Sequence, residues 1–133
     1  MLLVDTSVWI DFLAPRSTRA ADYFRTQLDA QEPFALTEFI YLEVLQGVRN
    51  PAAVRKVGTY LRAQTVLYPQ HGLRTYEAAA DLYRRCQAAG VTVRSTIDCL
   101  IAQLALEHNA TLLHSDRDYD RIARVEPRLK LAP

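Results

Sequence analysis

Cysteine and histidine are scarce in this chain. The two cysteines, Cys86 and Cys99, fall in segments expected to be helical and have no CxxC spacing, so we expect them to be small buried thiols. The three histidines show no metal-binding spacing of the HExxH type. The sequence therefore gives no support for a disulfide framework or a zinc site.

Long apolar runs are absent as well. No run approaches the roughly 20 residues that a membrane span requires. The start, residues 1–5, lacks the basic segment of a signal peptide and carries an acid in its apolar stretch. We therefore expect a cytoplasmic protein with no membrane contact. Half of the residues are hydrophobic and no repeat or long linker occurs, so residues 1–133 are expected to form one domain with a sizeable core.

Lysine is almost missing among the basic residues. Lys56 and Lys130 are the only lysines, arginine supplies the rest, and the formal net charge is +1. This balance excludes a polycation that binds any nucleic acid through bulk charge. Arginine forms bidentate contacts with phosphate, but it also forms ordinary surface ion pairs. The composition thus permits nucleic-acid binding without requiring it.

Short apolar segments alternate with helical patterns along the chain. Strands are predicted at residues 2–4, 34–36, 66–68 and 111–114, and residues 129–131 could form a final edge strand. Helices are predicted at about 7–13, 18–30, 38–46, 51–64, 73–89, 96–108 and 116–125, with Thr6 as the N-cap of the first. This alternation predicts an α/β fold, a single-domain α/β/α sandwich with a central, mainly parallel sheet.

Apolar segments lead directly into acids at three places. The first predicted strand ends at Asp5, an apolar helix carries Asp98 in its first turn, and a late strand leads to Asp116. A charged group beside a buried segment is unfavourable unless it is paired, hydrogen-bonded or bound to a metal. Open parallel sheets gather functional groups at the carboxyl ends of their strands. The three acids are therefore predicted to form one cluster.

Of these acids, Asp98 is the one whose position is least consistent with simple exposure to solvent. At about 100° per residue it projects away from the polar residues Gln103 and Glu107 of its helix and lies beside Ala102. The alternative is a capping box with Ser95, three residues earlier. Both interpretations can hold together, because helix N-termini favour anions.

The other acids have plainer alternatives. Asp5 could simply cap the helix that follows it. Ser115-Asp116-Arg117-Asp118 also fits a capping box, so one of its acids could bind a metal while the other caps. Asp116 is preferred as the primary acid and Asp118 is kept as an additional ligand. Glu43 shares a helical arc with other polar residues, so a solvated position explains it as well as a functional one.

Carboxylates gathered at one place would repel and raise one another's pKa values. A divalent cation relieves that repulsion, and an all-oxygen site suits Mg²⁺ or Mn²⁺ far better than Zn²⁺. Such an ion can activate water and stabilise the leaving oxygen of a phosphodiester. The chain contains no GxSxG elbow, P-loop or Rossmann glycine motif, so no other catalytic apparatus competes with this interpretation.

Four segments resemble, in order, the motifs of one family. Leu3-Val4-Asp5-Thr6-Ser7 resembles the opening of PIN domains, in particular of the VapC-type toxins of bacterial toxin–antitoxin pairs. Residues 37–47, 93–102 and 114–119 resemble the three later motifs of the family. The acids of these motifs fall on Glu43, Asp98 and Asp116, and Asp118 would be a further ligand. The similarity spans nearly the whole chain.

This resemblance implies a PIN-like fold and an endoribonuclease that uses Mg²⁺ or Mn²⁺ to cut RNA and shut down translation. Asp5, Asp98 and Asp116 would bind the metal, and Glu43 would bind it or orient the attacking water. The hydroxyls of Thr6 and Ser95 would lie in the site. Arg94 would contact phosphate, although it could equally pair with a surface acid.

The resemblance also implies partners. It predicts a homodimer that is inhibited by a small VapB-type antitoxin whose tail covers the acidic groove. It does not specify which RNA is cut, how many metal ions are bound or which antitoxin is the partner.

Two other functions remain as alternatives. A receiver domain or an aspartate-nucleophile phosphatase would also place an acid such as Asp5 after the first strand. The phosphatase pattern requires a second acid where Ser7 stands, and the receiver requires an acidic pair and a lysine for which Lys130 is poorly placed. A non-catalytic binding module with the same fold is the other alternative, and the presence of all four acids argues against it.

Overall fold

The computed structural model describes residues 1–133 as a five-stranded sheet with seven helices. The strands are β1 (Leu2–Val4), β2 (Phe34–Leu36), β3 (Thr65–Val66), β4 (Thr111–Leu113) and β5 (Lys130–Leu131). The helices are α1 (Thr6–Leu13), α2 (Arg19–Asp29), α3 (Glu38–Gly47), α4 (Pro51–Arg62), α5 (Leu73–Ala88), α6 (Thr96–Glu107) and α7 (Arg117–Val125). None of these helices combines the length and the apolar character that crossing a membrane requires.

The strands lie in the order β3-β2-β1-β4-β5, and every neighbouring pair is parallel. The chain therefore builds the sheet outward from β1 in one direction and then continues on the other side of β1 with β4. In open parallel sheets this reversal leaves a crevice at the carboxyl ends of the two strands that flank it. Here those strands are β1 and β4.

The register of β1 and β4 places specific residues at that crevice. Val4 pairs with Leu113, and the Asp5 N–H donates to the Leu113 carbonyl at 3.0 Å. Asp5 and His114 therefore leave the sheet side by side. The segment that follows β4 reaches Asp116 within three residues of the strand end.

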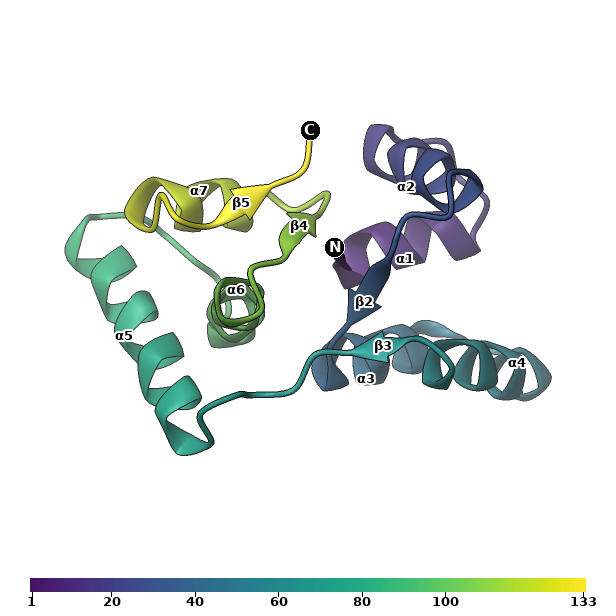
Figure 1. The fold of residues 1–133 in the computed structure, drawn as a ribbon, viewed down its shortest axis with the longest axis horizontal. Coiled ribbons are helices and arrows are strands. Elements are labelled where there is room, and N and C mark those ends of the chain that lie inside the picture. The colour runs from purple at the N-terminus through teal and green to yellow at the C-terminus, as the bar shows by residue number, and fades with distance from the viewer.

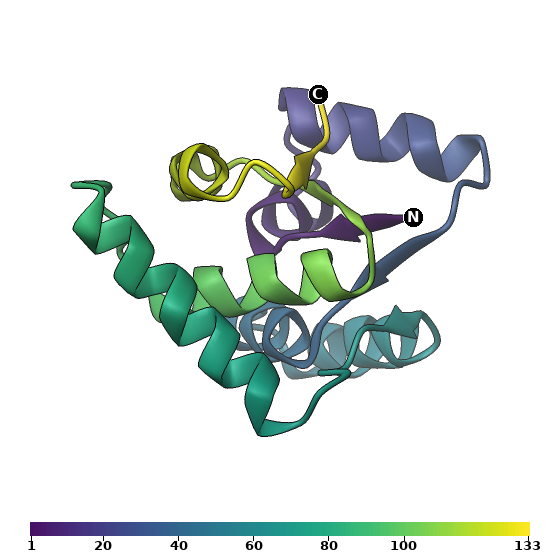
Figure 2. The same ribbon diagram turned by 60° about the vertical axis from the view of Figure 1, so that its left-hand side comes forward.

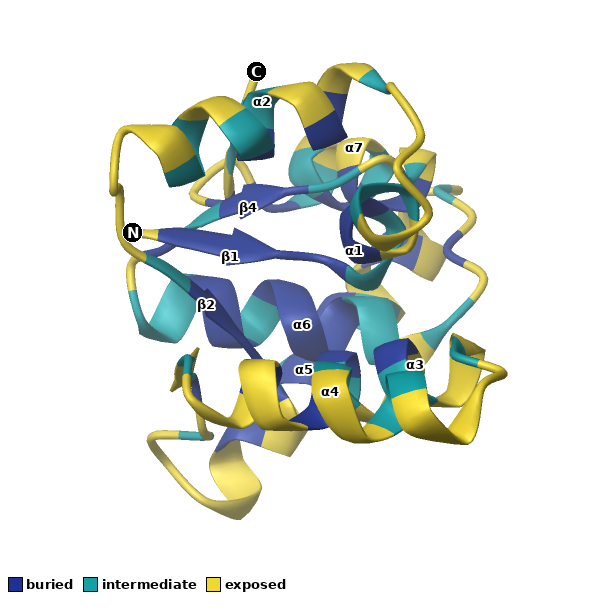
Figure 3. Ribbon diagram, turned by 90° about the vertical axis from the view of Figure 1, so that its right-hand side faces the viewer, coloured by how far each residue is buried: buried dark blue, intermediate teal, exposed yellow.

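Helices cover both faces of the sheet. Helices α1 and α2 lie on one side, and α5 and α6 lie on the other, as Figures 1 and 2 show. The central strands are buried while the outward faces of the helices are exposed (Figure 3). One cluster of 26 buried residues forms the main core. Within it Trp9 packs edge-on against Phe24 and donates its indole N–H to the Val4 carbonyl at 3.1 Å, which fixes α1 against β1.

The predicted order of strands and helices is confirmed, with two local corrections. The third strand is Thr65–Val66 rather than 66–68, because only Leu67 N–H continues the ladder, to the Leu36 carbonyl, before the chain turns outward at the exposed Tyr68. Thr6 is not the N-cap of α1. Asp5 has the extended backbone of a cap and its carboxylate accepts the Ser7 N–H, so Thr6 is already helical.

Candidate metal and catalytic site

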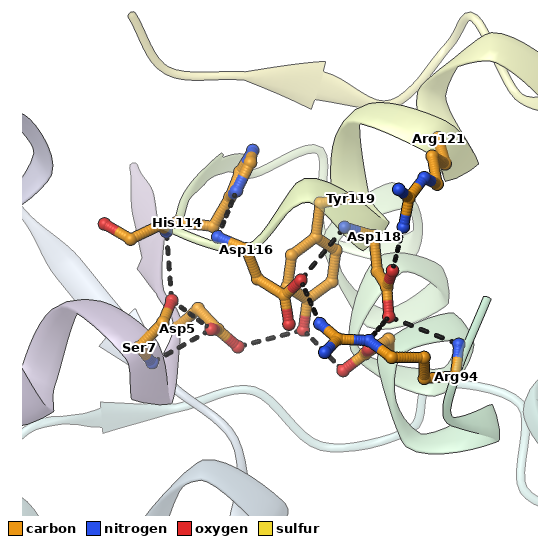
Figure 4. Close-up of polar contacts among 10 residues, drawn as sticks. Asp5, Ser7, Arg94, His114, Asp116, Asp118, Tyr119 and Arg121 are labelled. Carbon is orange, nitrogen blue, oxygen red and sulfur yellow. Dashed lines mark hydrogen bonds and ion pairs between the residues drawn. The ribbon is translucent and has the colours of Figure 1, made fainter. Parts of the chain in front are cut away.

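The acids predicted to cluster come together at the carboxyl ends of β1 and β4. Asp5 follows β1, Asp98 stands in the first turn of α6, and Asp116 caps α7. Asp98, Asp116 and Asp118 can each offer one carboxylate oxygen such that the three atoms lie within 4.8 Å of one another. Figure 4 shows Asp5, Asp116, Asp118 and their partners around this point.

Asp5 is nearly fully buried and tightly held. Its Oδ2 accepts the Ser7 N–H at 3.0 Å and the Ser7 hydroxyl at 2.6 Å, while its Oδ1 accepts the Tyr119 hydroxyl at 2.9 Å (Figure 4). Ser7 Oγ in turn accepts the Ser115 N–H at 3.0 Å, which ties the end of β1 to the end of β4. Asp5 therefore both caps α1 and belongs to the carboxylate cluster.

Tyr119 links two of the acids. Its hydroxyl bonds Asp5 and lies 3.4 Å from Asp98 Oδ1, although its ring is fully buried. Burial, followed by the charges of Asp5 and Asp98, raises the pKa of Tyr119 well above its usual value, so the phenol keeps its proton. A phenol has a single proton to donate, and the shorter contact assigns it to Asp5. Sequence reasoning missed this residue, because an aromatic side chain on an apolar face is expected in the core.

Asp98 is half-buried on the inner side of α6, as its helical position predicted. Burial raises its pKa to about 7, with further contributions from the charges of Asp116, Asp5 and Asp118. The capping box with Ser95 is not formed. Ser95 does cap α6, but its Oγ accepts the Ile97 N–H at 3.1 Å and Asp98 returns no bond to Ser95. The Asp98 carboxylate is therefore left to face the cluster.

Asp116 and Asp118 have different surroundings. Asp116, not Ser115, is the N-cap of α7, because its Oδ1 accepts the Asp118 N–H at 3.0 Å. Its other oxygen has no partner within the chain. Asp118 is fully buried, and arginines occupy both of its oxygens: Arg121 donates to Oδ1 at 2.9 Å, and the backbone and side chain of Arg94 donate to Oδ2.

The pKa of Asp118 reflects those arginines. Burial acts to raise it, but the hydrogen bonds from Arg94 and Arg121 outweigh burial, and the pKa of Asp118 lies below its usual value. Asp118 is therefore an ionised acid that already has its counter-ions. Of the two acids on α7, Asp116 is the one with an oxygen free to bind a ligand.

Arg94 forms ion pairs inside the cluster. Its Nη2 donates to Asp116 Oδ1 at 3.0 Å and its Nε donates to Asp118 Oδ2 at 3.1 Å, while 71% of its side chain remains exposed (Figure 4). The sequence left open whether Arg94 contacts phosphate or pairs with an acid. The structure shows the pairing, and the exposed guanidinium also remains accessible from solvent.

Glu43 stands apart from the three grouped carboxylates, on α3. Thr6 Oγ1 donates to its Oε1 at 3.0 Å. Burial raises the pKa of Glu43, the bond from Thr6 acts in the opposite direction, and the charge of Asp5 raises it further. Glu43 thus lies within the electrostatic reach of Asp5, with Thr6 connecting α3 to the start of α1.

The donor set fits a hard divalent cation. All of the available ligand atoms are carboxylate oxygens, which suit Mg²⁺ or Mn²⁺ rather than Zn²⁺. Burial is the main cause of the raised pKa of Asp98, and the charges of Asp116, Asp5 and Asp118 raise it further, as expected for carboxylates grouped without a cation. Both observations agree with a metal site.

Comparison with known proteins places this arrangement in a family. The family model of the PIN domain matches residues 2–125. Ribonuclease VapC11 of Mycobacterium tuberculosis is 36% identical over 126 residues, which cover 94% of this chain and 93% of that protein. A VapC ribonuclease of Mycobacterium bovis matches with the same identity and coverage.

Solved structures show the same fold. The VapBC-1 structure from nontypeable Haemophilus influenzae superposes with a TM-score of 0.72 at 21% identity, covering 98% of this chain and 96% of that one. FitAcB from Neisseria gonorrhoeae gives a TM-score of 0.69 at 16% identity, covering 100% of this chain and 97% of that one. With the family model, the close relatives and the fold in agreement, the chain belongs to the PIN domain family.

Proposed function

We propose that this chain is a Mg²⁺- or Mn²⁺-dependent endoribonuclease that acts as the toxin of a toxin–antitoxin pair, with residues 1–133 working as one PIN-like domain in the cytoplasm. The observation that carries the proposal is that Asp98 and Asp116 lie together with Asp118 at the crevice between β1 and β4, where Tyr119 connects Asp5 to Asp98. It occurs in a chain that is 36% identical to VapC ribonucleases over 94% of its length. Hydrolysis of RNA phosphodiester bonds would inhibit translation.

Asp5, Asp98 and Asp116 are the proposed metal ligands. Asp5 would use Oδ1, since Ser7 occupies its Oδ2 twice. Asp116 would use the oxygen that has no partner, and Asp118 would serve as a further ligand only where Arg94 releases it. When bound, the ion would neutralise these acids and the phosphate and would lower the pKa of a water molecule.

The neighbouring polar residues would handle water and phosphate. Glu43 would accept a proton from the attacking water through Oε2, because Thr6 occupies Oε1 and so orients the carboxylate. The raised pKa of Glu43 makes it a better base than an ordinary surface glutamate. Arg94 would contact the phosphate with its exposed guanidinium. Ser95 would position Asp98 by capping α6.

The proposed partners are an RNA substrate, a second copy of the chain and a VapB-type antitoxin. Among the structures with this fold are VapBC-1 and a Klebsiella pneumoniae protein described as a toxin–antitoxin complex. An apolar groove of about 320 Å³ between α1, α3 and α4, lined by Leu13, Val44 and Val57 among others, supports binding of an apolar partner segment.

The proposal is tested by incubating purified protein with RNA in the presence of Mg²⁺ or Mn²⁺ and separating the products by gel. Cleavage is expected with either ion and should stop in EDTA. Asp98→Asn and Asp5→Ala should each lower the cleavage rate by about 100-fold or more, since each removes a ligand.

Asp81→Asn is the matched control, because Asp81 is an exposed acid on α5 that pairs only with arginines of the same helix. It should cleave like the wild type. Activity that persists in EDTA, or that Asp98→Asn leaves unchanged, would refute the assignment.

A further inference from the structure

A polar trough runs along the surface beside the carboxylate cluster. Its first part, a hollow of about 460 Å³, has no apolar residue in its lining, which consists of Ser7, Arg94, Ser115, Asp116, Arg117 and Arg121. A second hollow of about 300 Å³ also includes Ser115, Asp116 and Arg117 and extends to Arg19. Because both hollows are lined by Ser115, Asp116 and Arg117, they adjoin at these residues, and together they are the trough.

Four arginines line the trough, and two of them have no partner. Arg94 pairs with Asp116 and Asp118, and Arg121 pairs with Asp118. Arg19 and Arg117 are exposed, and their side chains form no hydrogen bond or ion pair in the structure. They are therefore free to bind an anion from solvent.

Both free arginines stand where a helix disfavours a cation. Arg19 is the first residue of α2 and Arg117 is the first residue of α7. The amino end of a helix carries a partial positive charge, so an arginine there adds to the positive potential instead of offsetting it. Two such arginines on the wall of one trough favour anions at that wall.

We propose that this trough holds the sugar–phosphate backbone of the RNA strand, with Arg117 and Arg19 contacting phosphates on one side of the phosphate that is cleaved. The inference rests on the proposed function and names the surface that the substrate would follow. The planar fork of arginine matches phosphate oxygens. A strand whose phosphates follow these arginines passes over Asp116, which brings one phosphate to the carboxylates.

An acidic protein segment is the competing occupant, and the geometry favours RNA over it. The trough contains Asp116 and Asp120 as well as the arginines. Glutamate carboxylates and RNA phosphates would both stand near these acids, but a glutamate segment has no group that reacts at the cleavage site. RNA gains from the whole arrangement, because its phosphates are both the bound groups and the reacting group.

The test is RNA binding measured without cleavage. Fluorescence anisotropy in EDTA, over a range of KCl concentrations, would give the affinity of the wild type, Arg117→Gln and Arg19→Gln for a labelled single-stranded RNA of mixed sequence. Each substitution is expected to weaken binding about threefold at low salt. Each should also reduce the slope of log affinity against log salt by about 0.7, the value for one phosphate contact on a single strand.

Two further variants sharpen the result. Arg117→Lys keeps the charge and should retain most of the salt slope. Arg74→Gln is the matched control, because Arg74 is an exposed arginine in the first turn of α5 and lines neither hollow. It should bind RNA like the wild type. Circular dichroism would confirm that each variant is folded.

Wild-type affinity and salt slope in both Arg117→Gln and Arg19→Gln would overturn the inference. So would tighter binding of polyglutamate than of RNA with the same dependence on these arginines, which would assign the trough to an acidic protein segment. The proposed function fails separately: arginine-dependent RNA binding without cleavage in Mg²⁺ or Mn²⁺ would support the trough and refute the nuclease.

Discussion

At the scale of single residues, Asp98 is the clearest case of a side chain whose surroundings disfavour its ionised form. Burial and three neighbouring acids raise its pKa to about 7, against an ordinary value of 3.8. In the metal-free protein, this carboxyl contributes its full stabilisation below about pH 3.8 and loses it as the pH rises through 7. Above neutrality it is a charged group held among like charges.

Asp98→Asn should therefore stabilise the metal-free protein in alkaline solution. At pH 8 in EDTA we expect the free energy of unfolding to rise by about 1–3 kcal/mol, because asparagine removes the repelled charge. The gain should shrink as the pH falls below 7 and vanish below about pH 4. Urea unfolding at pH 8, 6 and 4 measures this. An equal effect of the substitution at all three pH values would contradict the charge-based account.

Tyr119→Phe tests the link between the acids. The substitution keeps the buried ring and removes only the hydroxyl that donates to Asp5 at 2.9 Å. Loss of a hydrogen bond to a charged group should lower the free energy of unfolding by about 1–3 kcal/mol. Because Asp5 Oδ1 then loses its orientation, Mn²⁺ affinity measured by calorimetry should fall as well. Unchanged Mn²⁺ affinity would show that the hydroxyl matters for stability alone.

The sequence predicted the acids of the site better than their supporting contacts. Asp98 could be identified because helical periodicity places it with small buried residues, away from the polar face of α6. Tyr119 and Ser7 could not, since a tyrosine in an apolar pattern and a serine after an acid are ordinary features. One indication was available: a buried tyrosine hydroxyl usually requires a partner, and Tyr119 directly follows Asp118. The pairing of Asp118 with Arg94 and Arg121 depends on contacts between separate elements, which spacing alone does not predict.

At the scale of secondary-structure elements, the sequence predicted which segments are helices and strands but misjudged how some begin. Asp5 caps α1 and Asp116 caps α7, so the alternative of an acid as the cap is confirmed at both places, and Thr6 and Ser115 are not the caps. The error has a physical cause. Aspartate, serine and threonine side chains can all cap a helix, so which of two neighbours does so depends on the backbone conformation that the fold imposes. Asp5 directly follows β1, whereas two residues separate β4 from Asp116; in both cases the same acid serves the helix and the cluster.

A buried acid outside the site joins helices α5 and α7. Glu126, just after α7, accepts Arg85 of α5 at 3.3 Å and Arg128 at 2.9 Å. The hydrogen bonds from Arg128 lower the pKa of Glu126 to about 2, although burial acts to raise it. This carboxylate therefore stabilises the fold above its ordinary pKa of 4.5 and loses that contribution as the pH falls through about 2.

Glu126→Gln should lower stability in a pH-dependent way. At pH 7 we expect a loss of about 1–2 kcal/mol in the free energy of unfolding, a modest value because the side chains of Arg85 and Arg128 are 43% and 80% exposed to solvent. The difference from the wild type should stay constant down to about pH 5 and decrease in more acidic solution. Urea unfolding at pH 7, 5 and 3 checks it. If the difference in the free energy of unfolding between the wild type and Glu126→Gln grew in acid, the ion pairs would not be its source.

At the scale of the whole molecule, the topology explains why these acids meet. The reversal of strand order at β1 brings the ends of β1 and β4 together, and α6 and α7 begin beside them. The sequence predicted the parallel sheet from the alternation of elements. The strand order itself came from pairing between segments far apart in the chain, such as Val4 with Leu113.

Growth of a bacterial host tests the toxin role. Expression of the chain without its antitoxin is expected to arrest growth, because cleavage of RNA stops translation. Asp98→Asn should relieve the arrest, whereas the control Asp81→Asn should not. Colony counts at equal protein levels, verified by immunoblot, measure the effect. Normal growth of cells that contain soluble wild-type protein would count against a toxin.

The central claim is that the converged carboxylates form one metal-dependent centre for cutting RNA. Its most direct test is to measure Mn²⁺ binding by electron paramagnetic resonance and RNA cleavage over the same range of Mn²⁺ concentrations, in the wild type and in Asp116→Asn. We predict that the two curves have the same midpoint in the wild type. In the variant both midpoints should shift together, to a Mn²⁺ concentration about 10- to 100-fold higher. Cleavage at full rate where no Mn²⁺ is bound, or a shift in binding without a shift in cleavage, would contradict the account.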